Sequence, residues 1–360
     1  MTIIIPANSA ADTAYEVANS CRFNDGDSPK LTITPGSAGN VDKWTLSMWI
    51  KRGSGTGNQT LFLAYTSSGN YTLIRFQGSG ATYPNAILFE NYVGAALKGQ
   101  IKTLPGWRDT SAWYHFVFVW DSGNATAGNR MRIYANGKEV TAFGSDVNPD
   151  QNQDSHVCGT VEHNFGNFNS EPFNGYMAEV ALCDGQTLAA SDFGEFDEDS
   201  PNIWKPKDIS GLTFGTTGFY LDFADSGDLG DDESGSSNDF AENNIAAVDQ
   251  ATDTPTLNYA TFDSGVTNYT PANNASYSEG NCKSVTTNTG GFGGCTTIGV
   301  TKGKWYAEFH LAAVSAANDA LAGAFKNPEE GFGANAPHDS NKFYGVRANG
   351  AKYTASTASN

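Results

Sequence analysis

Apolar and polar residues alternate in short runs through the first half of the chain. From Trp44 to Lys51, every second side chain is large and apolar and would face one side of a β-strand, namely Trp44, Leu46, Met48 and Ile50. Shorter apolar runs at 61–65, 71–76 and 86–89 are separated by turns rich in Ser, Gly and Asn. This spacing predicts short strands that are joined by tight turns.

Later stretches extend the same pattern. The run Trp113–Trp120 is apolar on both faces, which predicts a central strand that is covered on each side. Asn136 and Gly137 separate two alternating segments and favour the type I′ turn of a β-hairpin. Phe173–Leu182 predicts one more strand. Up to about residue 200, the pattern is typical of a β-sandwich or jelly roll.

The composition supports an all-β fold. The chain has 360 residues, enough for two or three domains, and includes 40 Gly, 22 Phe, 15 Tyr and 7 Trp. Gly, Asn, Ser, Thr and aromatic residues favour strands and turns over long helices. Because only 17% of the residues are charged while 12% are aromatic, a disordered acidic chain is excluded.

The formal net charge of −18 is concentrated in one part of the chain. Residues 192–253 hold sixteen acidic residues against Lys205 and Lys207, so the remainder is close to neutral. Gly218–Phe223 still has the pattern of a strand, so we expect a structured connector here. The lack of a basic cluster argues against nucleic acid as a partner.

A second β pattern begins after residue 253. Asn258–Phe262 and Gly303–Leu311 are predicted strands, and Asn349-Gly350 predicts a hairpin within Phe343–Tyr353. Only about a hundred residues remain for this pattern, which is short for two whole sheets. We therefore expect a second β-sandwich that is unusually small or incomplete.

Neither a leader nor a disulfide framework is indicated. Met1–Pro6 lacks a basic region and a long apolar core, so neither a signal peptide nor membrane insertion is expected. The five cysteines are odd in number and widely spaced, which favours buried thiols. Cys282 and Cys295 flank a Thr- and Gly-rich stretch and could face each other across a hairpin.

Five stretches of the first part of the chain carry a resemblance to a known module. They are Ser20–Ser28, Trp44–Arg52, Ser111–His115, Ile133–Gly137 and Phe173–Glu179. They resemble the concanavalin A-like, laminin G-like lectin module found in structural proteins of tailed bacteriophages, particularly marine ones, and the similarity covers about residues 20 to 196. Asn258–Phe262 and Val300–Glu308 resemble the opening of a SPRY-like β-sandwich.

The resemblance implies a domain organisation and a fold. It divides the chain into an N-terminal arm (1–19), a concanavalin A-like, laminin G-like lectin domain (20–196), an acidic connector (197–256) and a SPRY-like β-sandwich that is incomplete at its C-terminal end (257–360). The expected fold class is all-β, with a concanavalin A-like jelly-roll β-sandwich followed by the SPRY-like one.

The resemblance also implies a non-enzymatic virion protein that is made in the host cytoplasm. Its partners would be other virion proteins and itself, as a homo-oligomer such as a trimer. As a component of a tail fibre or similar appendage, it would bind glycans on the host surface. The alternative is a capsid or baseplate decoration protein whose lectin-like fold makes only protein contacts.

A polysaccharide-degrading enzyme is a third, disfavoured interpretation. Glycoside hydrolysis needs two carboxyl groups at a fixed separation. Glu195–Asp199 places acidic residues at alternate positions, but the glucanase pattern needs Glu at both ends, and here Asp199 or Ser200 stands in the last place. Pro201 then follows Ser200. His115 has no Ser or Cys partner at a recognisable spacing and is expected to be a structural, hydrogen-bonded strand residue.

Aromatic residues outside the predicted core are the candidate carbohydrate-binding residues. The apolar face of a sugar ring stacks on an aromatic ring, while polar neighbours bind the hydroxyl groups. The candidates are Tyr83, Tyr92, Trp107, Phe165 and Phe168. For each one, packing on the rim of the sandwich or on another subunit is the alternative. The tryptophans within predicted strands are expected in the core or in subunit contacts.

Calcium is the one cofactor that the sequence suggests. Hard cations prefer clustered oxygen ligands, and such oxygens gather in the stretch 225–239. The candidate ligands are Asp225, Asp228, Asp231, Asp232, Asn238 and Asp239. The stretch lacks the residue order of an EF-hand, and a solvated acidic turn is the alternative. Asn24–Asp27 is a second, weaker candidate.

Overall fold

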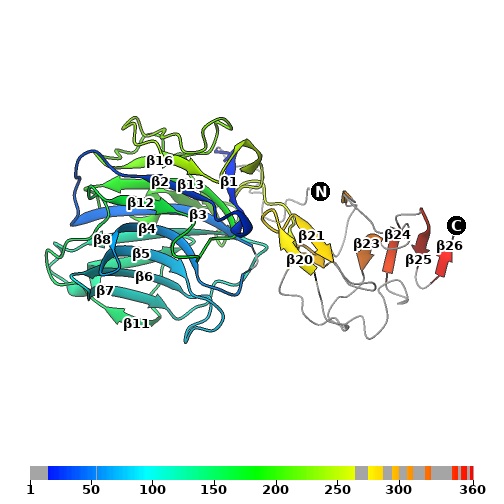
Figure 1. The fold of residues 1–360 in the computed structure, drawn as a ribbon, viewed down its shortest axis with the longest axis horizontal. Helices are drawn as coiled ribbons and strands as arrows, with labels where there is room; N and C mark the ends of the chain where they lie inside the picture. Colours follow the sequence, from blue (N-terminus) through cyan, green and yellow to red (C-terminus); the bar gives the residue numbers. More distant parts are fainter. Residues whose placement is uncertain are drawn as a thin grey trace. The chain divides into compact units, whose positions relative to one another are not determined.

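A computed structural model describes residues 15–53, 55–263, 275–286, 294–299, 306–310, 321–325, 343–347, 350–354 and 357–359. The chain divides into two compact units between Asn258 and Tyr259. The N-terminal unit is a sandwich of two antiparallel sheets, here sheets A and B (Figure 1). The all-β prediction is confirmed. In the described part of the chain, no helix is long and apolar enough to span a membrane.

Sheet A has 8 strands, in the order β10-β9-β8-β3-β13-β1-β18, and β16 also pairs with β13. Its strands are β1 (Ser20–Phe23), β3 (Lys43–Arg52), β8 (Trp113–Asp121), β9 (Met131–Ala135), β10 (Lys138–Glu139), β13 (Gly175–Asp184), β16 (Phe219–Leu221) and β18 (Gln250–Ala251). Every pair is antiparallel, so hairpins and longer returns, rather than helical crossovers, connect the strands.

Sheet B also has 8 strands, in the order β11-β7-β6-β5-β4-β12-β2-β17. They are β2 (Lys30–Ile33), β4 (Gln59–Ser67), β5 (Asn70–Phe76), β6 (Ile87–Val93), β7 (Ala96–Thr103), β11 (Phe143–Val147), β12 (Glu162–Phe165) and β17 (Ala241–Asn243). Figure 1 shows most of these strands side by side in this order. A two-stranded sheet and four 3₁₀ turns complete the unit, namely β14 (Gly194–Phe196), β15 (Trp204–Pro206), η1 (Asp25–Asp27), η2 (Ala127–Asn129), η3 (Ala190–Asp192) and η4 (Ala247–Asp249).

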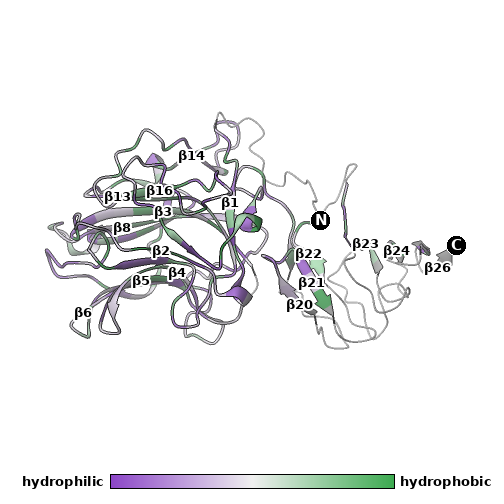
Figure 2. Cartoon of the chain, turned by 45° about the horizontal axis from the view of Figure 1, so that its top comes forward, coloured by the Kyte–Doolittle hydropathy of each residue, from purple (hydrophilic) through white to green (hydrophobic). Residues whose placement is uncertain are grey.

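The main hydrophobic core lies between the two sheets. The alternating residues of β3, from Trp44 to Ile50, are fully buried in it, as the sequence predicts. They meet large apolar residues of sheet B, such as Phe62 and Phe89. In Figure 2, hydrophobic stretches lie along the strands, whereas many of the connecting loops are hydrophilic.

The outer face of sheet A is covered as well. Val117 and Val119 of β8 turn away from the main core and pack with Phe193, Ile209 and Phe214 in a second cluster. A third cluster lies around Trp49, Trp113 and Tyr176. The prediction that Trp113–Trp120 forms a central strand covered on both sides is therefore confirmed.

The segment 197–256 is an integral part of the sandwich, which corrects the prediction of a connector. Its strand β16 pairs with β13, β17 pairs with β2, and β18 pairs with β1. Apolar residues of this segment, such as Leu221 and Phe240, lie in the main core. The acidic residues that suggested a connector alternate with these buried residues, so a high local charge did not mean a separate linker.

His115 is a hydrogen-bonded structural residue of β8, as predicted. It is fully buried between the rings of Trp49 and Trp204. Trp204 Nε1 donates to His115 Nδ1 over 3.0 Å, so Nε2 carries the proton that can be donated to Ser47 Oγ, 2.8 Å away. Burial lowers the pKa of His115 to about 3, so the ring is neutral at physiological pH.

The predicted Asn136-Gly137 hairpin is also present. Asn136 and Gly137 have φ angles of 48° and 77° and join β9 to β10, with Ala135 opposite Lys138. Two consecutive positive φ angles are the mark of a type I′ turn, and Asn and Gly adopt them most readily.

The described residues of the C-terminal unit include eight short strands. They are β19 (Phe262–Asp263), β20 (Ala275–Ser278), β21 (Lys283–Thr286), β22 (Cys295–Thr296), β23 (Leu321–Phe325), β24 (Phe343–Arg347), β25 (Lys352–Thr354) and β26 (Thr357–Ser359). Pairing of β24 with β25 confirms the hairpin predicted around Asn349 and Gly350.

Other predictions for this unit have different outcomes. Residues 306–310 are not in a strand, which corrects the prediction for Gly303–Leu311, whose other residues lie outside the described part. Cys295 lies opposite Asp263 on β19, whereas Cys282 is exposed and precedes β21. The described strands β21 and β22 thus pair with other strands and do not form one hairpin between the two cysteines. The SPRY-like resemblance stays a prediction.

Candidate functional site

The outer face of sheet B differs from that of sheet A. Leu63, Leu73 and Leu88 alternate with residues of the main core and therefore point outward. Unlike the outward residues of β8, they belong to none of the hydrophobic clusters formed by the described residues. These three leucines are themselves buried, with 1%, 3% and 2% of their surface exposed. We call this surface the open face because, among the described residues, no second hydrophobic cluster lies over it.

Four aromatic side chains form a row across the open face. Tyr65 on β4 lies opposite Tyr71 on β5, which lies opposite Tyr92 on β6. The rings of Tyr71 and Tyr92 are stacked with centroids 5.0 Å apart, and Phe168 contacts Tyr65 with centroids also 5.0 Å apart. All four residues are half-buried. Adjacent strands are about 4.8 Å apart, so the row runs perpendicular to the strands.

The hydroxyl groups in this row are not equivalent. Tyr71 Oη donates to Glu90 Oε1 over 3.2 Å. Burial raises the pKa of Tyr71, and the charge of Glu90 raises it further, so this hydroxyl keeps its proton at physiological pH. Within the described residues, the hydroxyls of Tyr65 and Tyr92 have no hydrogen-bond partner, which leaves them available to a ligand.

A chain of hydrogen bonds holds the polar residues beside the row. Gln100 Nε2 donates to Glu90 Oε2 over 2.8 Å, and Ser145 Oγ donates to Gln100 Oε1 over 3.0 Å. Glu90 and Gln100 are each 7% exposed. Because Glu90 accepts from both Tyr71 and Gln100, its position and that of Tyr71 are coupled.

The loop that carries Phe168 is tied to the same face. Arg75 of β5 forms an ion pair of 2.6 Å with Glu171, and Asn58 Nδ2 donates to the other oxygen of Glu171 over 2.8 Å. The backbone carbonyl of Glu171 accepts from the N–H of Thr60. These contacts restrict the loop and hold Phe168 against Tyr65.

Two of the five predicted carbohydrate-binding residues, Tyr92 and Phe168, therefore lie together on the open face. The sequence analysis missed Tyr65 and Tyr71, which lie in strands and which it grouped with apolar runs. The alternation around Ile74 and Phe76 was the available signal, because it places Tyr71 on the opposite face from these core residues.

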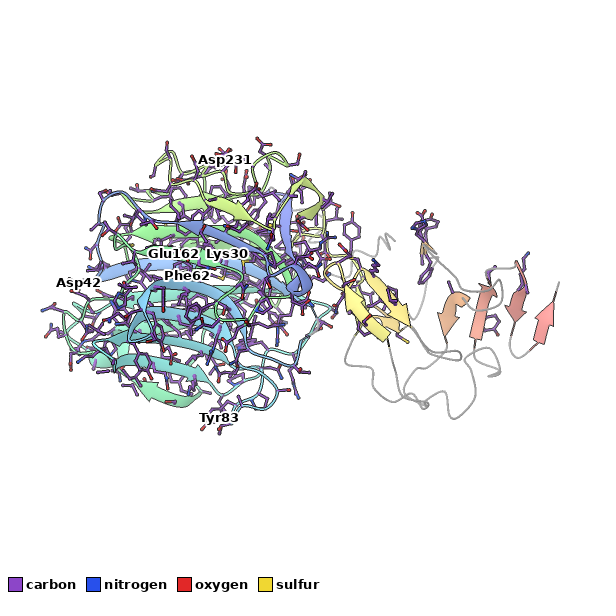
Figure 3. All side chains as sticks on the ribbon, viewed as in Figure 1. Lys30, Asp42, Phe62, Tyr83, Glu162 and Asp231 are labelled. Atoms are coloured by element: carbon purple, nitrogen blue, oxygen red, sulfur yellow. The ribbon has the colours of Figure 1, made fainter. Side chains whose placement is uncertain are left out.

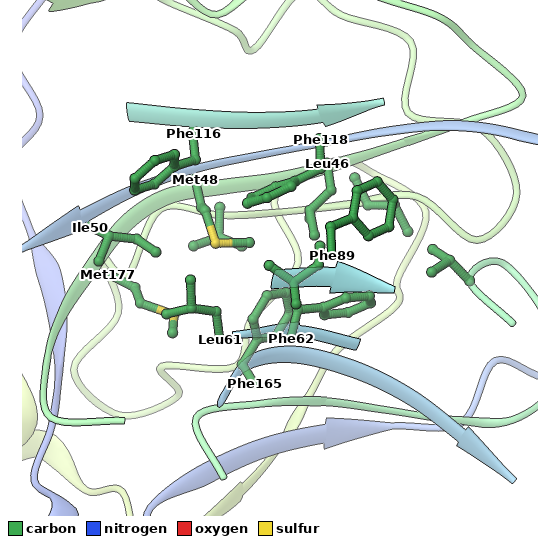
Figure 4. Close-up of a cluster of buried hydrophobic side chains, with 14 of the residues drawn as sticks. Leu46, Met48, Ile50, Leu61, Phe62, Phe89, Phe116, Phe118, Phe165 and Met177 are labelled. Carbon is green, nitrogen blue, oxygen red and sulfur yellow. The ribbon is translucent and has the colours of Figure 1, made fainter. Parts of the chain in front are cut away.

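The structure corrects the prediction that Phe165 binds carbohydrate. Phe165 is the last residue of β12, is fully buried, and contacts Phe62 in the main core (Figure 4). The sequence analysis placed it, like Phe168, outside the predicted core. Because β12 continues to Phe165, alternation turns this side chain inward and removes it from any surface site.

Trp107 packs on the rim of the sandwich. Its ring contacts Phe116 of the core edge to face, with centroids 5.2 Å apart, and Nε1 donates to Thr103 Oγ1. Its carbonyl oxygen accepts from the guanidinium of Arg52, which is itself buried and stacked on Phe76. The alternative of rim packing therefore describes Trp107.

Tyr83 lies at the far edge of the sheet. Its ring covers Gly144 of the edge strand β11, where an added Cβ would come within 2.5 Å of the ring. Figure 3 shows Tyr83 and Asp231 at opposite ends of the sandwich. The candidate sugar-binding and calcium-binding residues thus do not form one combined site.

The predicted calcium ligands are engaged in turns. The carboxylate of Asp232 is largely buried and accepts backbone N–H groups of Tyr220, Ser234 and Asn238 as well as the Ser234 hydroxyl. Asp225, Asp228 and Asp239 accept backbone N–H groups in the same manner. Partial desolvation and the charges of Asp239, Asp228 and Asp225 raise the pKa of Asp231.

No ligand set for calcium follows from this arrangement. Among the residues that the structure describes, no group of three or more His, Cys, Asp or Glu side chains could hold a metal ion. At the weaker candidate, Asn24 Nδ2 donates to Asp27 Oδ2 over 2.7 Å within the 3₁₀ turn η1. The carboxylates in both places stabilise local turns.

Calcium is therefore expected to leave the thermal stability of the protein unchanged. Carboxylate oxygens that already accept N–H groups would have to exchange these bonds for the cation. Thermal unfolding followed by circular dichroism, once with calcium and once with EDTA, should give the same Tm. A clear rise of Tm in calcium would show that the original prediction of a calcium site holds and that these turns rearrange.

The acidic stretch Glu195–Asp199 lies on and beside β14. Lys205 of β15 forms ion pairs with Glu195 and Asp197 over 3.4 and 3.5 Å. Glu195 has 54% of its side chain exposed, and the two carboxylates share one counter-ion. They are thus arranged as an ion-paired surface of a short hairpin.

Comparison with known protein families supports the lectin resemblance. Residues 25–191 match the Laminin_G_3 model, described as the concanavalin A-like lectin/glucanases superfamily. Residues 25–191 are thus similar to this superfamily, and the N-terminal unit has a concanavalin A-like, laminin G-like sandwich fold. A comparison with proteins of curated function returned no significant match.

Several solved structures are similar to part of the chain. A native heptameric SAP-like pentraxin from Limulus polyphemus has 17% identity and a TM-score of 0.35, covering 49% of this chain and 80% of that one. Domains LG4-5 of the mouse laminin alpha1 chain have 13% identity and a TM-score of 0.33, covering 49% and 45%. The CBM40 of a Ruminococcus gnavus IT-sialidase, bound to alpha2,3 sialyllactose, has 14% identity and a TM-score of 0.30, covering 42% and 81%. Likenesses at this level carry no functional argument.

Proposed function

We propose that the N-terminal sandwich binds saccharides through its open face. The observation that carries this proposal is the row of Phe168, Tyr65, Tyr71 and Tyr92 on the sheet surface without a covering cluster. Aromatic rings offer apolar contact to sugar C–H groups, and the available hydroxyls of Tyr65 and Tyr92 can bind sugar hydroxyls. The match to a family of lectins and glucanases supports the same class of ligand.

The direction of the row indicates how a saccharide would lie. The rings follow one another from β4 to β6 at about the spacing of adjacent strands, and Phe168 contacts Tyr65, the ring on β4. A linear saccharide running across the strands could contact several rings at once. The polar chain of Glu90 and Gln100 lies on one side of this path.

We further propose that the protein is a virion component of a tailed bacteriophage and uses this face on host-surface glycans. This proposal rests on the resemblance of the motifs, as does the expected association with other virion proteins and with itself. A decoration protein that uses the open face for protein contacts is the alternative. Labelling of the protein in intact particles would distinguish an appendage from the capsid surface or baseplate.

Replacing Tyr71 or Tyr92 by Ala should weaken saccharide binding by at least about tenfold, which corresponds to about 1.4 kcal/mol. Each substitution removes a ring from the row, and Tyr71→Ala also removes one of the two hydrogen-bond donors of Glu90. A glycan array identifies a ligand for the intact protein. Calorimetric titration with soluble oligosaccharides of increasing length then gives Kd for each variant.

Phe196→Ala is the matched control. Phe196 is 36% exposed on β14 and packs on Trp204, within the layer that covers sheet A. Its removal should leave binding unchanged. Equal loss of binding in the Phe196 and Tyr92 variants would place the ligand elsewhere. If no glycan on the array bound the protein, the interpretation as a decoration protein would be favoured.

A further inference from the structure

We propose that Glu179 is a proton-controlled latch that holds the N-terminal segment, residues 15–18, on the outer face of sheet A. The hydroxyl of Tyr15 donates to Glu179 Oε2 over 2.8 Å, and the hydroxyl of Tyr220 donates to the same oxygen over 2.9 Å. One carboxyl group thus joins the N-terminal segment to β13 and β16. Glu179 is only 4% exposed.

The backbone of β13 is arranged to place Glu179 there. The register between β13 and β3 shifts between Ala178 and Ala181, which marks a β-bulge. Glu179 lies in this bulge with a φ of 49°, in the left-handed region that residues other than Gly rarely adopt. A bulge redirects a side chain, and strained backbone of this kind gathers at functional positions. This geometry singles out Glu179 among the buried residues of the strand.

The N-terminal segment covers an apolar surface. Val17 is 3% exposed and belongs to a cluster with Trp49, Tyr176 and Ala178, against which Tyr15 also packs. Release of the segment would therefore expose the aromatic residues of this cluster to water. The latch thus controls access to a hydrophobic patch on sheet A.

A second attachment of the segment does not depend on the carboxyl group. The N–H of Val17 donates to Thr256 Oγ1 over 3.0 Å, and this hydroxyl lies 3.2 Å from the carbonyl oxygen of Val17, to which it can donate. The segment is therefore held at Tyr15 by Glu179 and at Val17 by Thr256. The hydroxyl of Tyr15 also lies 3.1 Å from the hydroxyl of Tyr220, which itself donates to Glu179. The Val17 amide reports on release, because its hydrogen bond breaks only when the segment moves away.

The groups that face Glu179 oppose its ionisation on balance. Burial raises its pKa to about 7, in spite of the hydrogen bonds from Tyr15 and Tyr220, and the charges of Asp222 and Asp208 raise it further. These groups come from the N-terminal segment, from β16 and the residue after it, and from the stretch before β16. The ionised carboxylate is therefore costly to keep in the closed form.

The direction of the pH effect follows from this difference. With the segment released and Glu179 hydrated, its pKa returns toward the ordinary value of 4.5. The closed form thus binds the proton more tightly, and the equilibrium constant for opening rises about tenfold per pH unit between about 4.5 and 7. The equilibrium constant for opening does not depend on pH below this window, where Glu179 is protonated in both forms, or above it, where Glu179 is ionised in both. The segment is held most tightly in acid.

Hydrogen exchange of the full chain, read by mass spectrometry at pH 5, 6, 7 and 8, tests the latch. After correction for the intrinsic exchange rate, protection of the peptide that contains Val17 should fall about tenfold per pH unit from 5 to 7, and change little from 7 to 8. The Glu179→Gln variant keeps the size of the side chain without the charge, and its protection should not depend on pH. Amides of β8 serve as the internal control.

Two results would overturn the proposal. One is protection of Val17 that is the same at every pH in the wild-type protein. The other is a Glu179→Gln variant that keeps the wild-type slope, which would assign the pH dependence to another group. Tyr15→Phe supplies a separate check, since loss of one hydrogen bond should increase exchange at pH 5. Unchanged exchange in Tyr15→Phe would show that its hydroxyl does not fasten the segment.

Discussion

A fragment that ends at residue 196 is expected to fail to fold, whereas a fragment that ends at residue 258 should fold by itself. The shorter fragment contains the whole stretch that resembles the lectin module. It lacks β16, β17 and β18, however, and with them one neighbour each of β13, β2 and β1. The consequence is exposed apolar surface on sheet A and an incomplete main core.

The expected size of this effect follows from the apolar side chains that are lost. A fully buried Phe, Leu or Ile side chain contributes about 1.5–3 kcal/mol to folding. The shorter fragment loses several such residues, including Ile209, Phe214, Phe219, Leu221 and Phe240. Their sum is comparable with the whole net stability of a typical domain, about 5–15 kcal/mol.

Circular dichroism and the dispersion of amide NMR signals distinguish the two fragments. The fragment 1–258 should melt cooperatively, and the fragment 1–196 should show no cooperative transition. If both fragments melted at the same temperature, the segment 197–256 would be a connector after all. The saccharide-binding experiments therefore require the longer fragment or the full chain.

Lys51→Met is expected to destabilise the sandwich by about 3–5 kcal/mol, because it removes one member of a buried ion pair. Lys51 is fully buried, and its Nζ lies 2.6 Å from Asp253 Oδ2 and 2.7 Å from Asn258 Oδ1. Trp113 Nε1 donates to the other oxygen of Asp253 over 2.9 Å. Without Lys51, the carboxylate of Asp253 would remain buried without its counter-charge.

Unfolding in urea or guanidinium chloride measures this loss of stability. Addition of Asp253→Asn to Lys51→Met should recover part of it, because the amide oxygen can still accept from Trp113 and carries no charge. Lys43→Met is the matched control. Lys43 is 42% exposed and lies 3.8 Å from Asp121, so its loss should cost less than about 1 kcal/mol. A Lys51 variant as stable as the Lys43 variant would contradict the expectation.

The local features of the sandwich could be predicted from neighbouring residues. The period of two between Trp44 and Ile50 identified β3, and the run from Trp113 to Trp120 identified a strand that is buried on both faces. Asn136 and Gly137 identified their turn by the φ angles that it requires. In each case the deciding interaction, side-chain alternation or backbone sterics, acts within a few residues.

The surface site could be predicted only in part. Phe165 and Phe168 both follow the polar residue Asn164 closely, yet β12 ends between them, and one ring enters the core while the other reaches the open face. Strand ends are poorly marked in sequence, and a shift of one residue reverses the direction of a side chain. Tyr65 and Tyr71 were missed for a related reason, since an aromatic residue within a strand can face either side.

The sequence by itself determined that the chain is all-β, where its strongest strands and hairpins lie, and which family of modules its first part resembles. Only the tertiary structure decided which sheet face is covered. Several distant segments could pack on either face, and the alternation within a strand does not show which segment does so. The chain after residue 196 and the segment around Val17 cover sheet A, so Val117 and Trp49 are buried there, while Tyr71 stays on the open face of sheet B. The many acidic residues of the segment 197–256 made this covering role hard to predict from the sequence. Only a minority of its side chains are apolar, and these are the ones whose burial stabilises the fold.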